Sequence, residues 1–304
     1  MNKKEFAERI RNEVEAQTHH MVEVKGVIKL NGQVLTGLLI QEEGYRIIPT
    51  IYLEQYYEEY KAGEEIEIIV SEIIKFYNKN KIKENEELSF FVDFSKVKGK
   101  IRYKLINFEA NKVLLQQIPY TRMLDLAKVY YISIDMCGIQ GYGNILIRNS
   151  HIELWNVTDE EVKHAAEENT PNQLPAQLIP IENLMMQLLK IEEGTKEHEL
   201  FQKEFAEEKR ISMYVITNTQ KIFGAATMCY KNLLNSIADS LGTDLFILPS
   251  SLHELILVPA KSDIQPKELK EMVVTVNRTD VELEERLSDN VYIYHKTTDT
   301  IAMI

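Results

Sequence analysis

Cysteine and long apolar runs are both scarce in this chain of 304 residues. Its two cysteines, Cys137 and Cys229, lie far apart and show neither CxxC nor metal-ligand spacing, so no redox motif or zinc site is indicated. No uncharged apolar stretch approaches the roughly 18 residues typical of a membrane-spanning helix. The first residues, MNKKEFAERIRNEVEAQ, lack the apolar segment of a signal peptide. We therefore expect a soluble protein of the reducing cytoplasm.

The familiar signatures of catalytic and nucleotide-binding sites are lacking too. The glycines at 138, 141 and 143 match neither GxGxxG nor a phosphate-binding Walker A loop,. No serine stands in a GxSxG elbow, and the seven histidines form no HExxH or HxH pattern,. Arginine, which suits bidentate phosphate recognition, is scarce. These absences predict neither a metal nor a cofactor, although ligands that converge only in space would leave no such pattern.

The composition that remains is typical of an acidic globular protein. Hydrophobic residues make up 44% of the chain and charged residues 27%, which excludes wholesale disorder and allows one large or two modest cores. The net charge of −12 at pH 7 favours solubility and repels nucleic-acid backbones and anionic membranes. We therefore expect no nucleic-acid partner and no membrane partner.

The clearest local signal is a β-hairpin near the amino terminus. Predicted strands over residues 23–30 and 34–41 flank Asn31-Gly32, a dipeptide that accepts positive φ at both central turn positions. A short amphipathic helix over residues 3–17 precedes the hairpin. A third strand over residues 45–51 follows it, with Pro49 indicating an edge or a strand end.

Three tyrosines follow this third strand at a spacing of four residues. Tyr52, Tyr56 and Tyr60 predict a helix with an aromatic face. One interpretation is structural, with the rings packed on the sheet and the hydroxyls in water. The other is a sticky aromatic surface that binds a peptide or another ligand. Gly63 ends this helix, and a second apolar helical period over residues 66–77 completes an α+β unit near Lys83.

The one dense basic segment of the chain covers residues 93–107. Its apolar residues Val97, Ile101 and Leu105 recur every four positions, so we predict a helix with a solvated basic face. We expect nearby carboxylates to neutralise the basic side chains, with an anionic partner or RNA as the alternative. These side chains are Lys96, Lys98, Lys100, Arg102 and Lys104.

The rest of the chain predicts a middle segment, a connection and a second lobe. A strand over residues 125–135 precedes a capping box of Thr158 and Glu161, where a helix begins that Pro171 and Pro175 close. Residues 181–210 are helical in pattern and strongly charged, with a break at Gly194. The elements expected after them are a strand over 213–218, a helix over 223–241, strands over 244–248 and 254–258, helices from Pro266 and from Thr279, and a strand over 290–296.

These elements predict four parts of the chain. They are an N-terminal α+β unit (1–83), a middle segment packed with it (84–180), a charged helical connection (181–212) and a C-terminal α+β lobe (213–304). The predicted fold class is α+β, with two lobes that are each a small, mainly antiparallel sheet covered by helices.

Hydroxyl, imidazole and carboxylate groups occur together in one predicted turn, and its candidate catalytic residues are Ser250, Ser251, His253 and Glu254. Nucleophilic catalysis needs a base in contact with the hydroxyl and a third group that orients the base. On an incoming strand Ser251 and His253 would point the same way and Glu254 the opposite way, which weakens a triad. We therefore favour a β-turn whose serines bond the backbone and whose histidine is a satisfied partner.

Seven stretches carry a family resemblance, in order over nearly the whole chain. They are LTGLLI (35–40), PTIYLEQYYEEYKAG (49–63), LINFEANKVLLQQIPY (105–120), DLAKVYY (125–131), TDEEVKHAAEENT (158–170), FGAATMCY (223–230) and FILPSSLHELILVP (246–259). The chain resembles an uncharacterised family of gut-dwelling anaerobic Firmicutes, known only as a domain of unknown function. Its late helix and strand-turn-strand are also similar to a second uncharacterised Firmicute family. The resemblance implies one full-length family unit and implies no activity.

Two functional hypotheses remain. The first is a non-enzymatic cytoplasmic binding or adaptor protein, whose partner is another protein or peptide and whose candidate binding residues are Tyr52, Tyr56 and Tyr60. The alternative is a hydrolase or nuclease-like enzyme that uses the turn of Ser251, His253 and Glu254 with acids from elsewhere. A pocket with a second polar cluster beside His253 would favour the enzyme, and a closed turn would favour the binding protein.

Overall fold

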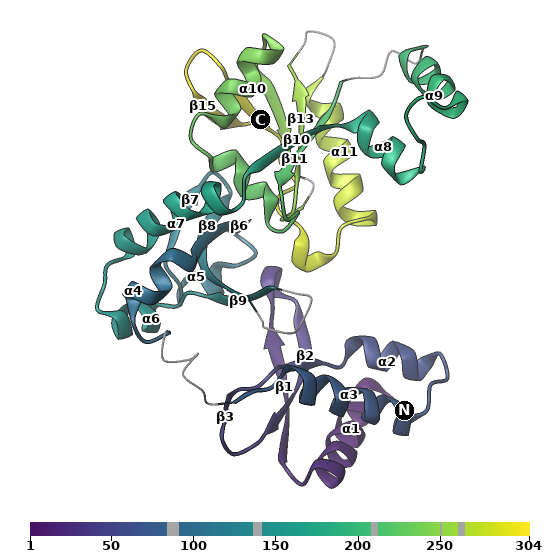
Figure 1. Ribbon diagram of the computed structural model, residues 1–304, viewed down its shortest axis with the longest axis vertical. Coiled ribbons are helices and arrows are strands. Elements are labelled where there is room, and N and C mark those ends of the chain that lie inside the picture. Colours follow the sequence, from purple (N-terminus) through teal and green to yellow (C-terminus); the bar gives the residue numbers. More distant parts are fainter. Residues whose placement is uncertain (84–90, 136–141, 208–211, 250, 261–264) are drawn as a thin grey trace. The chain divides into compact units, whose positions relative to one another are not determined.

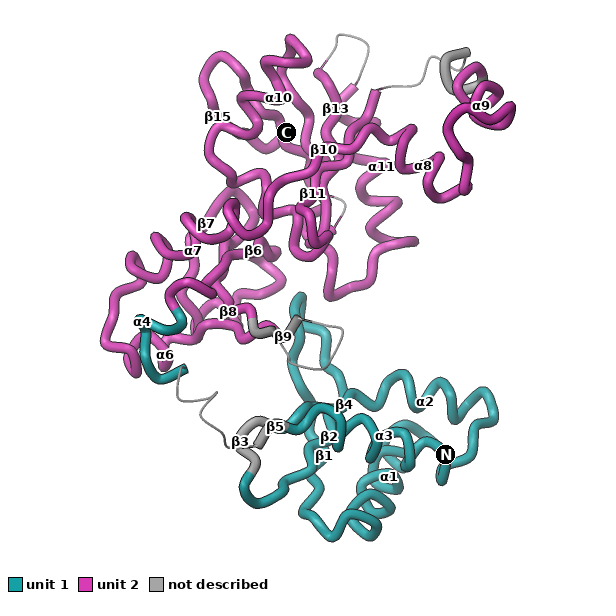
Figure 2. The backbone as a smooth tube through the Cα atoms, viewed as in Figure 1, with its two compact units in different colours: residues 1–97, 135–143 teal, residues 98–134, 144–304 magenta. Residues whose placement is uncertain are grey.

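The protein is an α+β fold that divides into two compact units (Figures 1 and 2). A computed structural model describes residues 1–83, 91–135, 142–207, 212–249, 251–260 and 265–304. Unit 1 contains residues 1–97 and 135–143, and unit 2 contains residues 98–134 and 144–304. Antiparallel strand pairs build the sheets of both units. The predicted α+β class, with small antiparallel sheets covered by helices, is confirmed.

Unit 1 is built around the expected hairpin. Its sheet has the order β1-β2-β4, with β1 at Met21–Ile28, β2 at Val34–Gln41 and β4 at Ile51–Tyr52. The register runs from Met21 opposite Gln41 to Ile28 opposite Val34. In the turn Asn31 has φ 58° and Gly32 has φ 73°, so both central positions take the left-handed conformation that the dipeptide predicted.

Three helices cover this sheet: α1 at Lys3–Thr18, α2 at Glu54–Lys61 and α3 at Ile66–Asn80. Asn2 and Glu5 form a capping box that starts α1,. The expected third strand is divided at Pro49, because β3 (Tyr45–Ile47) pairs with β5 (Ile82–Lys83) while β4 pairs with β2. The helices and the sheet enclose one core, whose fully buried members include Phe6, Ile10, Val14, Leu38, Ile40, Leu53, Ile69 and Ile73.

The first sheet of unit 2 corrects the expectation for the basic segment. Residues 93–107 form a short α4 (Phe94–Val97), a 3-10 turn η3 (Lys98–Lys100) and strand β6 (Ile101–Asn107). The predicted helix is wrong because Ile101, Tyr103 and Leu105 are buried in alternation. Residues spaced by four fit both a helix and a strand, and the buried Tyr103 between them selects the strand.

In this sheet β6 and β7 (Tyr120–Met123) pair with β8 (Leu126–Asp135), which also pairs with β9 (Tyr142–Leu146). Three helices belong to this part of the chain: α5 at Lys112–Leu115, α6 at Asn149–Trp155 and α7 at Asp159–Gln173. The expected capping box of Thr158 and Glu161 starts α7. Pro171 lies inside the helix, which ends at Gln173, between the two prolines expected to close it.

Residues 98–134 and 144–180 of the middle segment belong to unit 2. The ring of Tyr103 in β6 meets that of Tyr230 edge-on, with 6.4 Å between centroids. The Tyr230 hydroxyl in turn donates to the backbone oxygen of Leu174 at 2.7 Å. These buried aromatic contacts join residues 98–134 and 144–180 to the carboxy-terminal part of the chain.

The second sheet of unit 2 has six strands in the order β10-β11-β13-β12-β14-β15. They are β10 Ala176–Pro180, β11 Tyr214–Asn218, β12 Leu245–Leu248, β13 Leu255–Pro259, β14 Tyr292–His295 and β15 Thr300–Met303. Strands β12 and β13 were expected, whereas β15 was not. Its four residues alternate too briefly to stand out in the sequence.

The helices around this sheet differ from expectation at two places. The helix expected over 223–241 is a 3-10 helix η4 (Gly224–Cys229) and α10 (Leu233–Leu241), separated by Asn232 at φ 60°. The helix expected from Thr279 is wrong, because Thr279 ends α11 (Pro266–Thr279) and only the short η5 (Leu283–Glu285) follows.

The connection between β10 and β11 contains two helices, α8 at Ile181–Leu188 and α9 at Lys196–Glu207 (Figure 1). Gly194 separates them with φ 79°, as its sequence position predicted. None of the helices in the described residues combines the length and apolarity that a membrane crossing requires.

Candidate functional site

The turn between β12 and β13 contains the catalytic candidates, of which Ser250 lies outside the described residues. Ser251 is buried. Its hydroxyl oxygen accepts a hydrogen bond from the backbone N–H of His253 at 3.0 Å, and its own N–H donates to the backbone oxygen of Glu254 at 3.3 Å. Ser251 is therefore engaged in holding the backbone of its own turn, as serines in turns often are.

The imidazole of His253 has a partner at each nitrogen. Nδ1 accepts a hydrogen bond from the backbone N–H of Phe223 at 3.2 Å, so the proton of the neutral ring is on Nε2. Nε2 lies 3.4 Å from Oε1 of Glu285 in η5. The carboxylate that reaches this ring is thus Glu285, which sequence reasoning missed, and the contact between His253 and the Ser251 hydroxyl runs through the backbone.

Phe223 is the residue around which these contacts gather. Its φ of 54° is left-handed, a conformation that costs a bulky residue on the order of 1–3 kcal/mol. The His253 ring stacks on it, with centroids 5.7 Å apart and planes 15° from parallel. Nζ of Lys104 lies 4.1 Å from its ring centroid, and Tyr131 meets it at 5.4 Å. We call Lys104, Tyr131, Phe223, His253 and Glu285 the Phe223 cluster.

Gly224 lets the chain pass close to this turn. A Cβ at Gly224 would overlap the Thr217 hydroxyl and the backbone oxygen of His253. These two groups are themselves joined, because the Thr217 hydroxyl donates to that oxygen at 2.7 Å. The Ala225 N–H also donates to the backbone oxygen of Leu252 at 3.2 Å. The segment after Phe223 and the turn before β13 are therefore locked together by backbone contacts.

The side chains of the basic segment interact with several different kinds of group. Arg102 donates from Nε to the side-chain oxygen of Gln173 at 2.9 Å, and Lys104 lies over the ring of Phe223. Burial raises the pKa of Tyr131 to about 12, and Arg102 partly opposes that rise. The hydrogen bonds of Thr158, followed by the charge of Lys98, lower the pKa of Glu161. An amide and aromatic rings thus join the carboxylates that we expected as partners.

The tyrosines proposed for binding are each half-buried in unit 1. Tyr52 lies in β4 rather than in a helix, and Nζ of Lys29 is 4.0 Å from its ring centroid. Tyr60 contacts the buried ring of Phe6 at 5.4 Å. Burial, followed by the charges of Glu72 and Glu59, raises the pKa of Tyr56. These rings close one side of the core and still present part of their surface to solvent.

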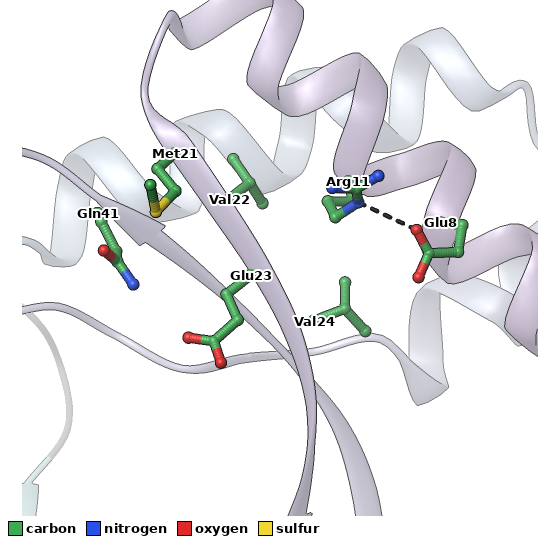
Figure 3. Close-up of a pocket in the computed structure, with 7 residues that line it drawn as sticks. All are labelled: Glu8, Arg11, Met21, Val22, Glu23, Val24 and Gln41. Atoms are coloured by element: carbon green, nitrogen blue, oxygen red, sulfur yellow. Dashed lines mark hydrogen bonds and ion pairs between the residues drawn. The ribbon is translucent and has the colours of Figure 1, made fainter.

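Unit 1 also has an open hollow of about 400 Å³ beside α1 and β1 (Figure 3). Arg11, the cation of its lining, donates to the carboxylate of Glu8 at 3.0 Å. None of the candidate residues from the sequence lines this hollow. Its other lining residues come from β1 and β2 and are Met21, Val22, Glu23, Val24 and Gln41.

A comparison with family models decides where the chain belongs. A family of unknown function, DUF5688, matches residues 3–296, which is nearly the whole chain. The chain belongs to the DUF5688 family. No curated protein and no solved structure matches it. Membership in DUF5688 confirms the resemblance to a family of unknown function and assigns no role to any residue.

One polar cluster of this DUF5688 chain escaped sequence reasoning altogether. Asp125, between β7 and β8, accepts hydrogen bonds from the side chains of Ser288 at 2.6 Å, Asn290 at 3.0 Å and Tyr292 at 2.8 Å. Ser288 and Tyr292 are buried. Asp125 belongs to the DLAKVYY stretch, but nothing in that stretch identifies partners more than 160 positions away.

Histidines and carboxylates meet in pairs elsewhere in the structure. His295 lies 3.0 Å from Asp244, and His20 lies 3.5 Å from Glu42. Within the described residues, no group of three or more histidine, cysteine or acidic side chains is arranged to hold a metal ion. The pairs hold neighbouring elements together, since Asp244 also accepts the backbone N–H of Lys296 at 3.0 Å.

Proposed function

We propose that the protein is a non-enzymatic binding or adaptor protein that acts in the cytoplasm, with another protein or a peptide as its partner. The observation that carries this proposal is the engagement of both ring nitrogens of His253. Nδ1 accepts from the Phe223 backbone, and Nε2 faces Glu285. The best candidate for a general base among the sequence motifs is therefore used as a structural link.

Catalysis by this turn would require a different arrangement. A general base must direct a free lone pair at the proton of the nucleophile. The lone pair of Nδ1 is occupied, and the Ser251 oxygen takes the backbone N–H of His253. To act on a hydroxyl, His253 would have to release the N–H of Phe223, a residue already in a strained conformation,.

The binding surface that we propose for unit 1 contains Tyr52, Tyr56 and Tyr60. Tyrosine is enriched at protein interfaces because its ring contributes apolar contact and its hydroxyl contributes a hydrogen bond. These rings are half-buried, so a partner could contact them without reorganisation of the core. Acidic residues of α2 such as Glu58 and Glu59 stand beside them and would favour a peptide with basic residues.

The alternative function, a hydrolase or nuclease-like enzyme, is favoured by one observation. Glu285 supplies a carboxylate from outside residues 249–254, 3.4 Å from the imidazole. In a catalytic triad the carboxylate orients the imidazole, and the imidazole acts as the base when its second ring nitrogen faces a hydroxyl. Here the second nitrogen faces a backbone N–H, which is why we rank this function second.

A serine-reactive fluorophosphonate separates the two functions. We expect no adduct on Ser251 when the intact chain is incubated with the reagent and examined by mass spectrometry and peptide mapping. An adduct on Ser251 that disappears in His253→Gln, with an unchanged melting temperature, would establish an activated nucleophile and overturn the proposal.

The binding role has its own test in affinity purification from the protein's own host. We expect a protein partner that the wild type and His253→Ala both retain and that Tyr56→Ala loses, provided that its melting temperature shows it to be folded. If Tyr56→Ala retained the partner, the tyrosines would not be part of the binding surface. If only His253→Ala lost the partner, the turn of His253 would be the binding surface.

A further inference from the structure

Helix α8 has an apolar stripe that the fold covers only in part. Ile181, Leu184, Met185 and Leu188 follow the i, i+3, i+4, i+7 spacing of a helix that packs on a core,. In α3 the same kind of stripe is buried, as Ile69, Val70 and Ile73 show. In α8, all of whose residues the structure describes, every residue stays at least partly exposed.

The exposure is greatest at the carboxy-terminal end of α8. Leu188 is 74% exposed and the following Leu189 is 60% exposed. Leu200 on α9 adds a third leucine that is 57% exposed. Large apolar side chains that gather on one short segment mark an interaction site more often than single exposed residues do. We call residues 181–200, which comprise α8, the loop after it and the start of α9, the α8 surface.

The α8 surface has an acidic rim. Between residues 182 and 199 the sequence has five glutamates and two lysines, and Glu192, Glu193, Glu197 and Glu199 are exposed. The loop that holds this rim has a defined structure. The Thr195 hydroxyl donates to the backbone oxygen of Glu192 at 2.7 Å and accepts from the His198 N–H at 3.2 Å. Glu192 and Glu193 thus lie in a hydrogen-bonded turn, and Glu197 and Glu199 lie at the start of α9.

We propose that the α8 surface binds a basic amphipathic helix of a partner protein. The apolar face of that helix would cover the leucines and methionines of α8, and its lysines or arginines would face the glutamates of the rim. Met185 and Met186 suit this role because methionine side chains adapt to partners of different shape. The inference rests on the proposed binding function, and it names a partner class and a second surface, on unit 2.

Charge excludes two other occupants. A second copy of the chain would bring the same acidic rim and a net charge of −12 to the contact, so the two surfaces would repel one another. A membrane surface that carries anionic lipids would be repelled for the same reason. The glutamates would attract a cationic helix, whereas they would repel a second copy of the chain and an anionic membrane.

The test uses the full chain and a labelled model peptide of about 18 residues, with leucines on one helical face and lysines on the other. Fluorescence anisotropy measures its binding to the wild type, to Leu188→Asp/Leu189→Asp and to Leu154→Asp, a control at an exposed leucine of α6. We expect a Kd on the order of micromolar for the wild type and the control, and a loss of at least about tenfold in the double variant.

A second comparison checks the acidic rim. Glu192→Gln/Glu193→Gln should weaken binding several-fold at low ionic strength and reduce its dependence on salt. A peptide with glutamate in place of lysine should not bind. Equal binding by the Leu188→Asp/Leu189→Asp variant would overturn the inference, as would a wild-type dimer that this variant abolishes in sedimentation. Neither result bears on the fluorophosphonate test of Ser251, so the two proposals fail separately.

Discussion

The hydroxyl of Tyr292 donates a 2.8 Å hydrogen bond to Oδ1 of Asp125, a residue that lies 167 positions earlier in the chain. Burial, followed by the charge of Asp125, raises the pKa of Tyr292, so the hydroxyl remains a donor at all ordinary pH values. Ser288 and Asn290 donate to the other carboxylate oxygen. Asp125 thereby joins the sheet of β6 and β8 to the loop before β14, within unit 2.

Removal of this carboxylate should destabilise unit 2. Asp125→Ala leaves the buried hydroxyls of Tyr292 and Ser288 without their acceptor, so we expect a loss of about 3 kcal/mol in the free energy of unfolding. Asp125→Asn retains one acceptor oxygen and should cost about 1 kcal/mol. Chemical denaturation measures both, with Glu153→Ala at an exposed site of α6 as a control that should change little,. Equal stability of Asp125→Ala and the wild type would contradict the linking role.

A methyl group at Gly224 should be poorly tolerated. Its Cβ would overlap the Thr217 hydroxyl and the His253 backbone oxygen, so Gly224→Ala should cost about 3 kcal/mol through overpacking. Gly99→Ala is the matched control, because a Cβ there meets open space. Thermal unfolding of both variants checks the difference. Similar melting temperatures would show that the turn can move away from the 3-10 helix η4 without cost.

The aromatic contacts of unit 1 predict unequal effects for two truncations. Phe6 is fully buried and contacts the rings of Tyr57 and Tyr60 at 5.3 and 5.4 Å, so Phe6→Ala should cost about 4 kcal/mol. Tyr56 is half-buried, and Tyr56→Ala should cost roughly half as much. Urea denaturation gives both values. If Tyr56→Ala lost more free energy of unfolding than Phe6→Ala, the tyrosines of α2 would contribute mainly to the core and not to a binding surface.

The stability of unit 1 should depend on the ionisation of Glu42. Its carboxylate accepts hydrogen bonds from Lys81 at 2.6 Å and Tyr77 at 3.0 Å. The Lys81 bond is the main cause of a pKa below the ordinary value, which the Tyr77 bond and the charges of Lys81 and His20 lower further. Because the folded pKa lies below the unfolded value of about 4.3, this stabilisation is complete above pH 5 and is lost as the pH falls through the folded pKa.

Glu42→Gln should therefore reduce the loss of stability that unit 1 shows as the pH falls. We expect the variant to be less stable than the wild type at pH 7 and to approach it near pH 3, in denaturation curves followed by circular dichroism. Glu43→Gln, at the exposed neighbouring position, is the control for the loss of one charge. A gap that stays constant between pH 3 and 7 would assign the effect of Glu42 to packing rather than to ionisation.

The local elements were predictable where neighbouring residues alone specify the backbone. Asn31-Gly32 predicted its turn because both residues accept positive φ,. Thr158 and Glu161 predicted the start of α7 because their side chains satisfy helix-end amides,. The prediction was wrong for residues 101–107, since Ile101 and Leu105 fit a helix and a strand equally well. Only the burial of Tyr103 against Tyr230 distinguishes the two.

The candidate site, too, was predictable from the sequence only in its local features. The sequence by itself determined the fold class, the family and the turn that carries Ser251 and His253, because motifs and periodicity act over a few residues. Only the tertiary structure decided that Phe223 and Glu285 contact the two ring nitrogens of His253, and that Leu188 and Leu189 at the end of α8 stay exposed. Those outcomes depend on which surfaces meet when distant segments pack, and no local pattern specifies that choice.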